Sequence, residues 1–276
     1  MRRGRVSLVA LALALFGLLG LGTEAFAQEV AGSVVDAVKG RGLLRVGLSL
    51  FMPRVMRDKA GRLIGFDVDV ANKVAEEMGV KPELVLTAWD GIIPALYLGK
   101  FDVIISGMII SPDRNLTVNF TVPYATDGLG LAANKKLAGS FKGVEDFNKP
   151  GVKLTVRRGA TPYIALIRKL FPKAIMLEFD DDDQALKEVL DGKAHAVLSG
   201  EPRPTFWRLD HPDSLVQPID VPLMLNLRAF AIRKGDVDSL NFFNNWILVR
   251  TQDGWLPERR DYWFKSRQWG DLVPKQ

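Results

Sequence analysis

The chain has 276 residues, 47% of them hydrophobic and 25% charged, which allows one or two globular domains with a sizeable core. Its 37 basic and 32 acidic residues are interspersed, so the net charge of +5 gives no indication of a nucleic-acid partner. The chain has no cysteine, which excludes disulfides, thiol catalysis and lipidation through cysteine. Its two histidines, His195 and His211, have no metal-ligand neighbour at motif spacing, so we expect no metal and no cofactor.

The N-terminus has the three parts of a secretory signal peptide. Three arginines within the first five residues are followed by an apolar run over residues 6–21 and by the small-residue cleavage motif Ala25–Ala27. We therefore expect residues 1–27 to be a signal peptide, with an uncleaved membrane anchor as the alternative. Cleavage would remove three arginines and one glutamate and lower the net charge to +3. An exported chain without cysteine favours the bacterial periplasm.

Predicted strands and helices alternate in the first half of the remaining chain. Short apolar runs indicate strands, and apolar residues spaced three and four apart indicate helices. The strands are predicted at residues 43–48, 84–86 and 103–105, and the helices begin near residues 34, 66 and 90. Asp90 is the predicted N-cap of the last of these helices. This alternation predicts a parallel sheet with right-handed crossovers.

The second half continues the alternation. Strands are predicted at residues 152–156, 175–179, 196–198 and 229–232, and helices after residues 161, 183 and 239. We expect Thr161 to cap the helix that follows it, with Pro162 at the first helical position. The acidic run Asp180–Asp183 is expected to compensate the dipole of the next helix in a solvated turn. The aromatic-rich tail over residues 255–269 is expected to pack against the core rather than to bind a ligand.

One stretch of the sequence recurs. Gly99–Gly107 (GKFDVIISG) and Gly192–Gly200 (GKAHAVLSG) share their glycines, a lysine and a serine, and their apolar positions match in character. Either two related lobes each end a strand in Ser-Gly, or both stretches are a common turn before a buried strand. We expect an α/β fold of two lobes, residues 28–133 with 228–276 in one and 134–227 in the other. Ligands of open α/β sheets bind beyond the carboxyl ends of the strands, which places a ligand cleft at the two-strand hinge between the lobes.

Four motifs in register resemble the periplasmic solute-binding proteins of family 3, which serve ABC importers of polar amino acids. The motifs are GFDVDVA (65–71), WDGIIPAL (89–96), GKFDVIISGMIISPDR (99–114) and FTVPY (120–124). The resemblance runs through essentially the whole chain after residue 27. It implies a type II periplasmic-binding-protein fold, which closes on its ligand by a hinge motion. It also implies a permease of an ABC transporter in the inner membrane as the partner, and we expect the receptor to be a monomer.

The resemblance also implies ligand contacts. Arg114 matches the arginine that grips the α-carboxylate of the ligand, and Thr161 matches a threonine at the start of a helix in the second lobe, where free N–H groups favour an anion. Trp89 and, less closely, Phe51 match the two aromatic faces that enclose the ligand. The further expected contacts are Ser106, Gly107, Ile109, Arg158, Gly200 and Glu201.

Departures from the family pattern bear on the ligand. Members that bind α-amino acids usually carry an aspartate for the ammonium group where this chain has Gly200, although the adjacent Glu201 could replace it. An acidic residue that often follows the first strand is missing as well. Four arginines lie in loops expected near the cleft: Arg54, Arg157, Arg158 and Arg203. Few anionic and many cationic groups favour an acidic ligand, so we expect a small carboxylate and not lysine or arginine. It could be an acidic or modified amino acid or an amine-free organic acid.

Two alternatives use the same fold. Exported cyclohexadienyl and arogenate dehydratases are similar too, including the Trp-rich tail, but Arg203 stands where their catalytic glutamate is expected and Glu201 is two residues away. A dehydratase needs an acid at its leaving hydroxyl, so the mismatch favours a binding protein over an enzyme. The other alternative is a sensory or scavenging module that signals through a partner, which the sequence does not separate from a transport receptor.

Overall fold

The computed structural model describes residues 32–219 and 221–274, so the predicted signal peptide, residues 1–27, lies outside the described residues. The chain divides into Met1–Gly32 and Ser33–Gln276, and all the described secondary structure belongs to the second unit. No helix in the described part of the chain is long and apolar enough to cross a membrane.

Ten strands form one mixed sheet with the main order β4-β1-β5-β12-β7-β10-β8-β9, while β2 and β3 pair separately. Strand β6 pairs with β12, and β11 pairs with β7. The strands are β1 (Leu43–Leu48), β2 (Met56–Arg57), β3 (Leu63–Ile64), β4 (Lys81–Leu86), β5 (Val103–Ile109), β6 (Val118–Phe120), β7 (Ala125–Asn134), β8 (Lys153–Arg157), β9 (Ile175–Phe179), β10 (Ala196–Gly200), β11 (Leu215–Val216) and β12 (Leu225–Arg233).

Helices connect most of these strands, as the predicted alternation requires. They are α2 (Val34–Arg41), α3 (Phe66–Glu77), α4 (Ile92–Tyr97), α5 (Pro112–Asn115), α6 (Lys135–Ala138), α7 (Val144–Phe147), α8 (Thr161–Leu170), α9 (Asp182–Leu190), α10 (Arg203–Asp210), α11 (Val237–Gln252) and α12 (Trp255–Phe264). Two short 3-10 helices complete the set, η1 (Trp89–Gly91) and η2 (Gln268–Leu272).

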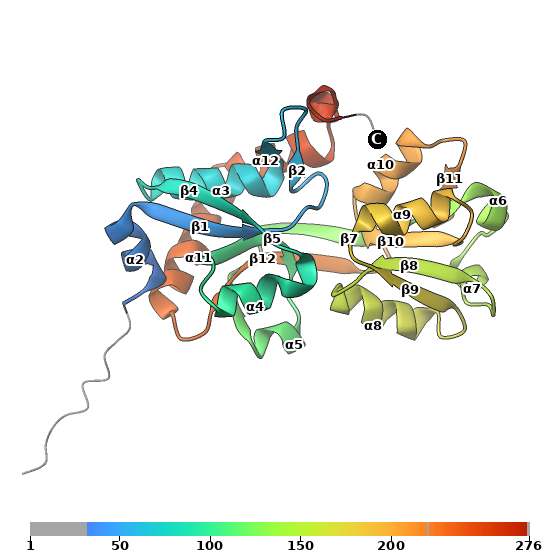
Figure 1. Cartoon of the computed structure of the whole chain (residues 1–276), viewed down its shortest axis with the longest axis horizontal. Helices are drawn as coiled ribbons and strands as arrows, with labels where there is room; N and C mark the ends of the chain where they lie inside the picture. Colours follow the sequence, from blue (N-terminus) through green and yellow to red (C-terminus); the bar gives the residue numbers. More distant parts are fainter. Residues whose placement is uncertain (1–31, 220, 275–276) are drawn as a thin grey trace, which may run out of the picture. The chain divides into compact units, whose positions relative to one another are not determined.

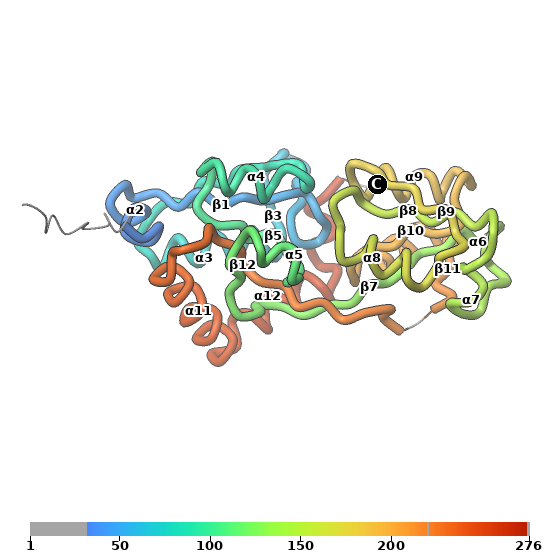
Figure 2. The backbone as a smooth tube through the Cα atoms, turned by 90° about the horizontal axis from the view of Figure 1, so that it is seen from below, coloured from blue at the N-terminus to red at the C-terminus, as the bar shows by residue number. Residues whose placement is uncertain are grey.

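Strands β7 and β12 join two α/β lobes. The strands β4-β1-β5 of one lobe are parallel to one another, and so are β10-β8-β9 of the other. Between them β12 and β7 run antiparallel to each other and to their outer neighbours, and they pass side by side from lobe to lobe (Figures 1 and 2). Strand β7 pairs with β12 up to Gly128 and with β10 from Leu129 onward. The predicted two-lobed α/β fold is confirmed, and the exact lobe boundaries at residues 133 and 228 stay a prediction.

The buried positions follow the predicted periodicity. In α3, Ala71, Val74 and Ala75 are all buried, which is the apolar face read from the sequence. In the C-terminal tail, Trp263 and Trp269 are buried in a hydrophobic cluster that includes residues of both lobes, and Trp269 packs against Phe206 of α10, so this aromatic segment packs against the core as expected. Most of the apolar side chains therefore lie where their spacing predicts.

Two predicted helix caps are wrong. Helix α4 is preceded by η1, and its N-cap is Gly91 rather than Asp90. Helix α8 begins at Thr161 itself, with Ala160 as the N-cap and no side-chain cap. In both places the chain tightens into the first helical turn one residue away from the predicted cap, so the polar side chain lies outside the capping position.

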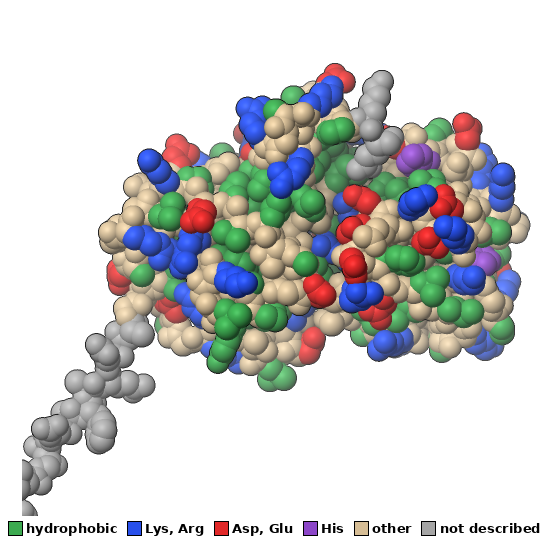
Figure 3. All heavy atoms as spheres, in the orientation of Figure 1, with side chains coloured by type: hydrophobic (Ala, Val, Ile, Leu, Met, Phe, Trp, Pro, Cys, Tyr) green, Lys and Arg blue, Asp and Glu red, His purple; other side chains and the backbone are tan. Residues whose placement is uncertain are grey.

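The surface and the interior differ in how their charges are arranged. On the face shown in Figure 3, basic and acidic side chains are interspersed, and neither kind gathers into one large patch. Several of the exposed ones form local ion pairs, such as Lys187 with Asp191 and Lys265 with Asp261. Most of the buried charged side chains, by contrast, lie close to the two hinge strands, where the carboxyl ends of the parallel strands also meet.

Candidate functional site

A narrow cavity of about 30 Å³ lies at the carboxyl ends of the strands, on the lobe-to-lobe boundary beside the hinge. Six of the predicted site residues line it: Phe51, Trp89, Ser106, Gly107, Ile109 and Arg114. The rest of the lining is Arg157, Ala160, Tyr163, Asp182, Leu198 and Arg228. Phe51 follows β1, Trp89 follows β4, and Arg157 ends β8, so the cavity lies at the sheet edge where the strand order predicts a ligand.

Arg114 is a buried cation that forms no ion pair with any residue the structure describes. Its side chain lies at the end of α5, and the residue is 7% exposed. Its Nη1 donates to the Ile109 carbonyl (3.2 Å) and its Nη2 to the Gly159 carbonyl (3.0 Å), and no carboxylate within the described ranges lies within 4 Å of it. Burial lowers the pKa of Arg114 to about 10; the nearby Arg228 adds to this effect and Asp113 opposes it. A buried guanidinium with unused donors is suited to bind a carboxylate.

Trp89 lies between two arginines. The guanidinium carbons of Arg114 and Arg157 lie 5.5 Å and 5.3 Å from the centre of its ring, within the range of cation–π attraction. Its Nε1 donates to the Gly159 carbonyl (3.1 Å), the same oxygen that accepts from Arg114. Both residues of the first lobe therefore hold the backbone of the second lobe at Gly159, which closes the cavity on that side.

Arg157 crosses from the second lobe to the first. Its Nη2 donates to the Ser49 hydroxyl (2.6 Å) and its Nη1 to the Leu50 carbonyl (3.0 Å), both in the segment after β1. Its Nη1 also lies 3.7 Å from the Asp182 carboxylate. Burial lowers the pKa of Arg157, and the repulsion of Arg203 adds to this, whereas Asp182 partly restores it.

The acidic run Asp180–Asp183, predicted to be a solvated helix start, is only partly so. Asp181 caps α9 by accepting from the Gln184 amide (2.8 Å), as expected for a solvated helix start. Asp182, however, is buried and lines the cavity. It lies 2.8 Å from the Arg203 guanidinium and accepts a hydrogen bond from the Ser199 hydroxyl (2.9 Å), so its charge is already paired.

A buried charge network lies behind the cavity at the hinge. The Nε of Arg228, in β12, donates to both carboxylate oxygens of Asp127 in β7, each at 3.0 Å. Asp127 also pairs with Arg54 (2.9 Å), whose other nitrogen contacts Asp67 (3.2 Å). Burial raises the pKa of Asp67. Burial alone would also raise that of Asp127, but the two arginines bring it below its ordinary value.

Counted together, the cavity and its hinge network carry excess positive charge. The buried cations are Arg54, Arg114, Arg157, Arg203 and Arg228, and the buried anions are Asp67, Asp127 and Asp182. With all of them ionised, five positive charges face three negative ones. Two positive charges thus lack an anion among these residues.

Four predicted site residues do not line this cavity. Arg158 has a side chain that is 52% exposed and pairs with Asp180, so the structure places Arg157 rather than Arg158 at the site. Thr161 is exposed and donates a long hydrogen bond to Asp113 (3.4 Å). The side chain of Thr161 therefore points across the boundary between the lobes toward Asp113 and does not line the cavity.

Gly200 lies directly behind the cavity wall. A Cβ atom at this position would lie 2.7 Å from Nη2 of Arg228, 2.8 Å from the Tyr163 hydroxyl and 3.2 Å from the Phe51 ring. Any side chain at residue 200 would therefore displace the Arg228 guanidinium, and the glycine makes room for it.

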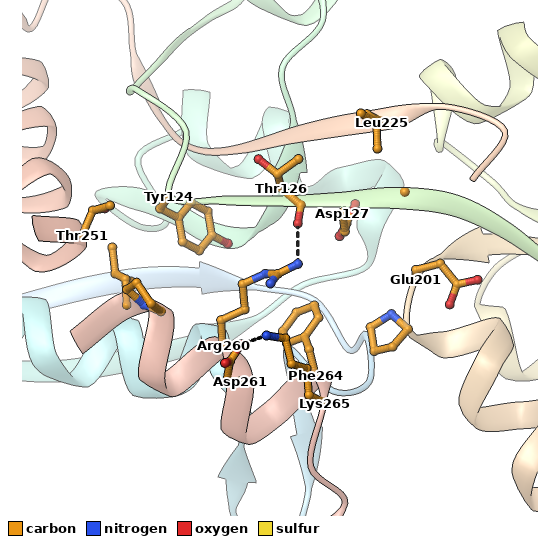
Figure 4. Close-up of a pocket in the computed structure, with 14 residues that line it drawn as sticks. Tyr124, Thr126, Asp127, Glu201, Leu225, Thr251, Arg260, Asp261, Phe264 and Lys265 are labelled. Atoms are coloured by element: carbon orange, nitrogen blue, oxygen red, sulfur yellow. Dashed lines mark hydrogen bonds and ion pairs between the residues drawn. The ribbon is translucent and has the colours of Figure 1, made fainter. Parts of the chain in front are cut away.

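Glu201 lies in a different pocket, which has a volume of about 750 Å³ (Figure 4). It shares this pocket with Arg260 and Phe264 of α12, and Figure 4 shows Arg260 donating to the Thr126 carbonyl (2.9 Å). Burial raises the pKa of Glu201, although Thr205, which donates to its carboxylate, works against that rise. The structure therefore separates Glu201 from the cavity that holds Trp89 and Arg114.

The comparisons with known proteins agree with this architecture. The family model of the bacterial extracellular solute-binding proteins, family 3, matches residues 44–266. The chain belongs to this family. The L-cystine-binding protein TcyJ of Escherichia coli (strain K12) is 30% identical to this solute-binding protein over 271 residues, 95% of each chain. Cyclohexadienyl dehydratase of Pseudomonas aeruginosa is 27% identical over 242 residues, 87% of this chain and 88% of the enzyme.

A solved structure of a binding component of an ABC transporter from Wolinella succinogenes, complexed with lysine, is 40% identical. Its TM-score is 0.78, and the match covers 84% of this chain and 99% of the other. The predicted family is thus confirmed. Membership implies a small-molecule ligand and an ABC transporter as partner for this solute-binding protein.

The serines of the internal repeat have matching structural roles in the solute-binding protein. Ser106 accepts from the Ser49 amide (2.9 Å), which fixes the segment after β1. Ser199 donates to Asp182 (2.9 Å), which fixes the start of α9. In each lobe the buried serine of the Ser-Gly pair holds a segment that follows another strand of the same lobe, β1 for Ser106 and β9 for Ser199, so the repeat is a structural one.

Six of the residues that line the cavity are not among the predicted ligand contacts, and two of these six, Arg157 and Arg228, carry a signal in the sequence. Arg228 is a charged residue inside a mostly apolar strand, LNLRAFAIR, and burying its charge there is costly unless the charge is paired. Arg157 and Arg158 follow each other at the end of a predicted strand, where successive side chains point to opposite sides, so one of the two is expected to face the ligand-binding edge of the sheet. Tyr163 and Asp182 have no comparable signal, because their burial depends on Arg228 and Arg203 from distant segments.

Proposed function

We propose that this solute-binding protein is the periplasmic receptor of an ABC importer and that its ligand is a small carboxylate bound by Arg114. The observation that carries the proposal is the burial of the Arg114 guanidinium at the cavity with carbonyl partners only. A carboxylate there would form charge-assisted hydrogen bonds to donors that the protein leaves unused. The mature receptor would begin at Gln28, after an N-terminal signal peptide.

The proposed ligand contacts follow from the lining of the cavity. Trp89 and Phe51 would cover the apolar part of the ligand, and Ser106 and Gly107 would limit its size from the β5 side. The ligand would enter when residues 134–227 swing away from the remainder of the chain about β7 and β12. Closure would then bring Gly159 back toward Trp89 and Arg114, with the lobes slightly further apart than in this structure, because a cavity of about 30 Å³ has room for only about one or two water molecules.

The charge of the site favours an anion over a cation. The Wolinella succinogenes protein was solved with lysine, which is a property of that protein. In the present chain the buried groups around the cavity carry two more positive than negative charges. A ligand ammonium would be repelled by this excess, because charges interact strongly where little water screens them. This argument supports an acidic ligand and leaves both amino acids with acidic side chains and amine-free acids as candidates.

No enzymatic activity is proposed. A dehydratase needs an acid that can reach the leaving hydroxyl of its substrate. Asp182 is the acidic residue that lines the cavity, and it is held by Arg203 and Ser199. Glu201 lines the other pocket. This arrangement supports a receptor.

A thermal-shift screen of residues 28–276 against amino acids and small organic acids tests the proposal. A ligand at a hundredfold excess over its dissociation constant stabilises the folded protein by about 2.7 kcal/mol. We expect a shift with at least one carboxylate and its loss in Arg114→Ala. Shifts only with cationic amino acids, or turnover of a cyclohexadienyl substrate without any shift, would contradict the proposal.

A further inference from the structure

The hinge end of the cavity has its own set of hydrogen-bonding groups. Arg228 and Tyr163 both line the cavity there, next to Gly200. Nη2 of Arg228 donates to the Tyr163 hydroxyl (2.6 Å), and the Arg228 guanidinium carbon lies 5.9 Å from the centre of the Phe51 ring. These groups belong to β12 and α8, on opposite sides of the lobe boundary, and therefore come together in the closed arrangement.

Most of the acceptors near this end are already occupied by the protein itself. The Gly107 carbonyl accepts from Nη1 of Arg228 (2.6 Å), and the Ile109 carbonyl accepts from Arg114 (3.2 Å). The Asp127 carboxylate accepts from Arg228 and from the side chains of Arg54 and Asn226. An ammonium group needs free acceptors, and the Gly107, Ile109 and Asp127 oxygens are already bound to arginines. A buried acceptor without a partner among the described residues is the side-chain oxygen of Asn226, which is neutral.

Donors, in contrast, are still available. The Tyr163 hydroxyl accepts from Asn226 (3.1 Å) and Arg228, and its own proton has no acceptor within residues 32–219 and 221–274. Burial raises the pKa of this hydroxyl, so it stays protonated and can donate. Arg228 keeps its charge, because Asp127 and Tyr163 outweigh the effect of burial and raise its pKa. A group that accepts hydrogen bonds and carries negative charge suits these donors.

The two guanidinium groups are spaced along one strand. Arg228 donates to the carbonyl of Gly107 in β5. Arg114 donates to the carbonyl of Ile109, which lies two residues further along the same strand. Gly107 has a left-handed backbone (φ +58°), so β5 is not regular at this point, but two residues of chain span at most roughly 7 Å in any conformation. One short ligand can therefore reach both arginines with its two ends.

We propose that Arg228 and Tyr163 form a second anion subsite and that the ligand is an amine-free dicarboxylate. One carboxylate would bind Arg114, and the other would bind the Arg228 guanidinium and the Tyr163 hydroxyl. Two negative charges on the ligand would match the excess of two arginines over aspartates among the buried side chains, where exposed carboxylates such as Asp183, 3.7 Å from Arg203, give only partial compensation. This inference rests on the proposed receptor function and names its substrate class.

Isothermal titration of residues 28–276 with succinate, glutarate, adipate, pentanoate and L-glutamate tests it. Pentanoate matches the carbon chain of glutarate without the second carboxylate, and L-glutamate adds an ammonium group. We expect at least one dicarboxylate to bind at least about tenfold more tightly than both pentanoate and L-glutamate. Equal or tighter binding of pentanoate or L-glutamate overturns the inference but leaves the receptor function intact. If no carboxylate binds, both the function and the inference are wrong.

Two variants locate the second subsite. Arg228→Met combined with Asp127→Asn removes one positive and one negative charge, so no unpaired aspartate stays buried. This double variant should bind the best dicarboxylate at least about thirtyfold more weakly. The dissociation constant of the dicarboxylate should then be close to that of pentanoate. Tyr163→Phe keeps the ion pair of Arg228 with Asp127 and should weaken binding of the dicarboxylate about fivefold. This variant tests the subsite even if the double variant does not fold. An unchanged ratio of glutarate to pentanoate binding in a folded variant overturns the inference.

Discussion

Replacing Arg114 by methionine should weaken ligand binding while leaving the ligand-free protein at least as stable as the wild type. The two effects have one cause, the burial of a cation that the protein does not pair. Methionine has a similar length and no charge, so it fills the space of the guanidinium without its desolvation cost. A variant that merely misfolds would instead lose both binding and stability.

The magnitudes follow from the geometry of Arg114. Its pKa falls from 12.5 to about 10, and each pKa unit corresponds to about 1.4 kcal/mol, so burying the charge costs on the order of 3 kcal/mol in this conformation. A ligand carboxylate removes that cost when it binds. Truncating one partner of a buried, hydrogen-bonded charge pair costs about 2–5 kcal/mol, which corresponds to a roughly thirtyfold to several-thousandfold weaker affinity.

Isothermal titration with a carboxylate ligand and thermal unfolding without ligand measure the two effects separately. We expect a dissociation constant at least about thirtyfold higher for Arg114→Met and an unfolding temperature equal to or above that of the wild type. If the variant bound the ligand with wild-type affinity, Arg114 would not hold the carboxylate. If its ligand-free form were several kcal/mol less stable, Arg114 would be a structural residue.

Three further predictions concern neighbouring positions. Arg157→Met should weaken binding at least about tenfold because its guanidinium lines the cavity, whereas Arg158→Met, its exposed neighbour, should bind as the wild type does. Gly159→Ala should cost about 1–2 kcal/mol of stability and weaken binding, because its φ is +74° and a Cβ would lie 3.2–3.3 Å from Asp90 and Trp89 across the lobe boundary. Glu201→Gln should become more stable relative to the wild type as the pH rises from about 4 to about 7, since burial raises the pKa of Glu201 and its charged form destabilises the folded state.

Each of these predictions has a result that would refute it. Equal losses of affinity in Arg157→Met and Arg158→Met would mean that the cavity is not the ligand site. Wild-type binding by Gly159→Ala would show that close approach of the lobes at this glycine is not required. A difference in unfolding temperature between Glu201→Gln and the wild type that does not change with pH would exclude a buried, destabilised carboxylate.

The fold could be predicted because its signals are local. Apolar runs and helical periodicity mark the strands and helices of each lobe, and their alternation predicts parallel strands. The hinge strands β7 and β12 are antiparallel to their neighbours, and each pairs with strands far away in the sequence. No local pattern encodes the residue at which β7 changes partner, so the lobe boundary was harder to predict than the lobes.

The errors at the site come from consecutive residues at strand ends. Successive side chains of a strand point to opposite faces, so a one-residue difference decides whether a side chain faces the cleft. Arg157 lines the cavity and Arg158 is exposed. Gly200 borders the cavity and Glu201 lines another pocket. The positions of four arginines in predicted loops indicated an excess of positive charge near the cleft, but the geometry of the strand ends decides which arginines line the cavity.

The buried aspartates could not be assigned from the sequence. Asp182 belongs to an acidic run whose other members are typical of a solvated helix start. It is buried because Arg157 and Arg203 come to it from two other segments. Asp127 lies in a strand of mixed character and is buried because Arg54 and Arg228 pair with it. Their roles depend on tertiary contacts between residues more than twenty positions apart.

The claim that the receptor binds an acidic ligand is tested most directly by isothermal titration of residues 28–276 with small carboxylates and, separately, with L-lysine and L-arginine. The account predicts saturable binding of at least one carboxylate that carries no cationic group, loss of that binding in Arg114→Met, and no saturable heat with either cationic amino acid. Micromolar or tighter binding of L-lysine or L-arginine would contradict it.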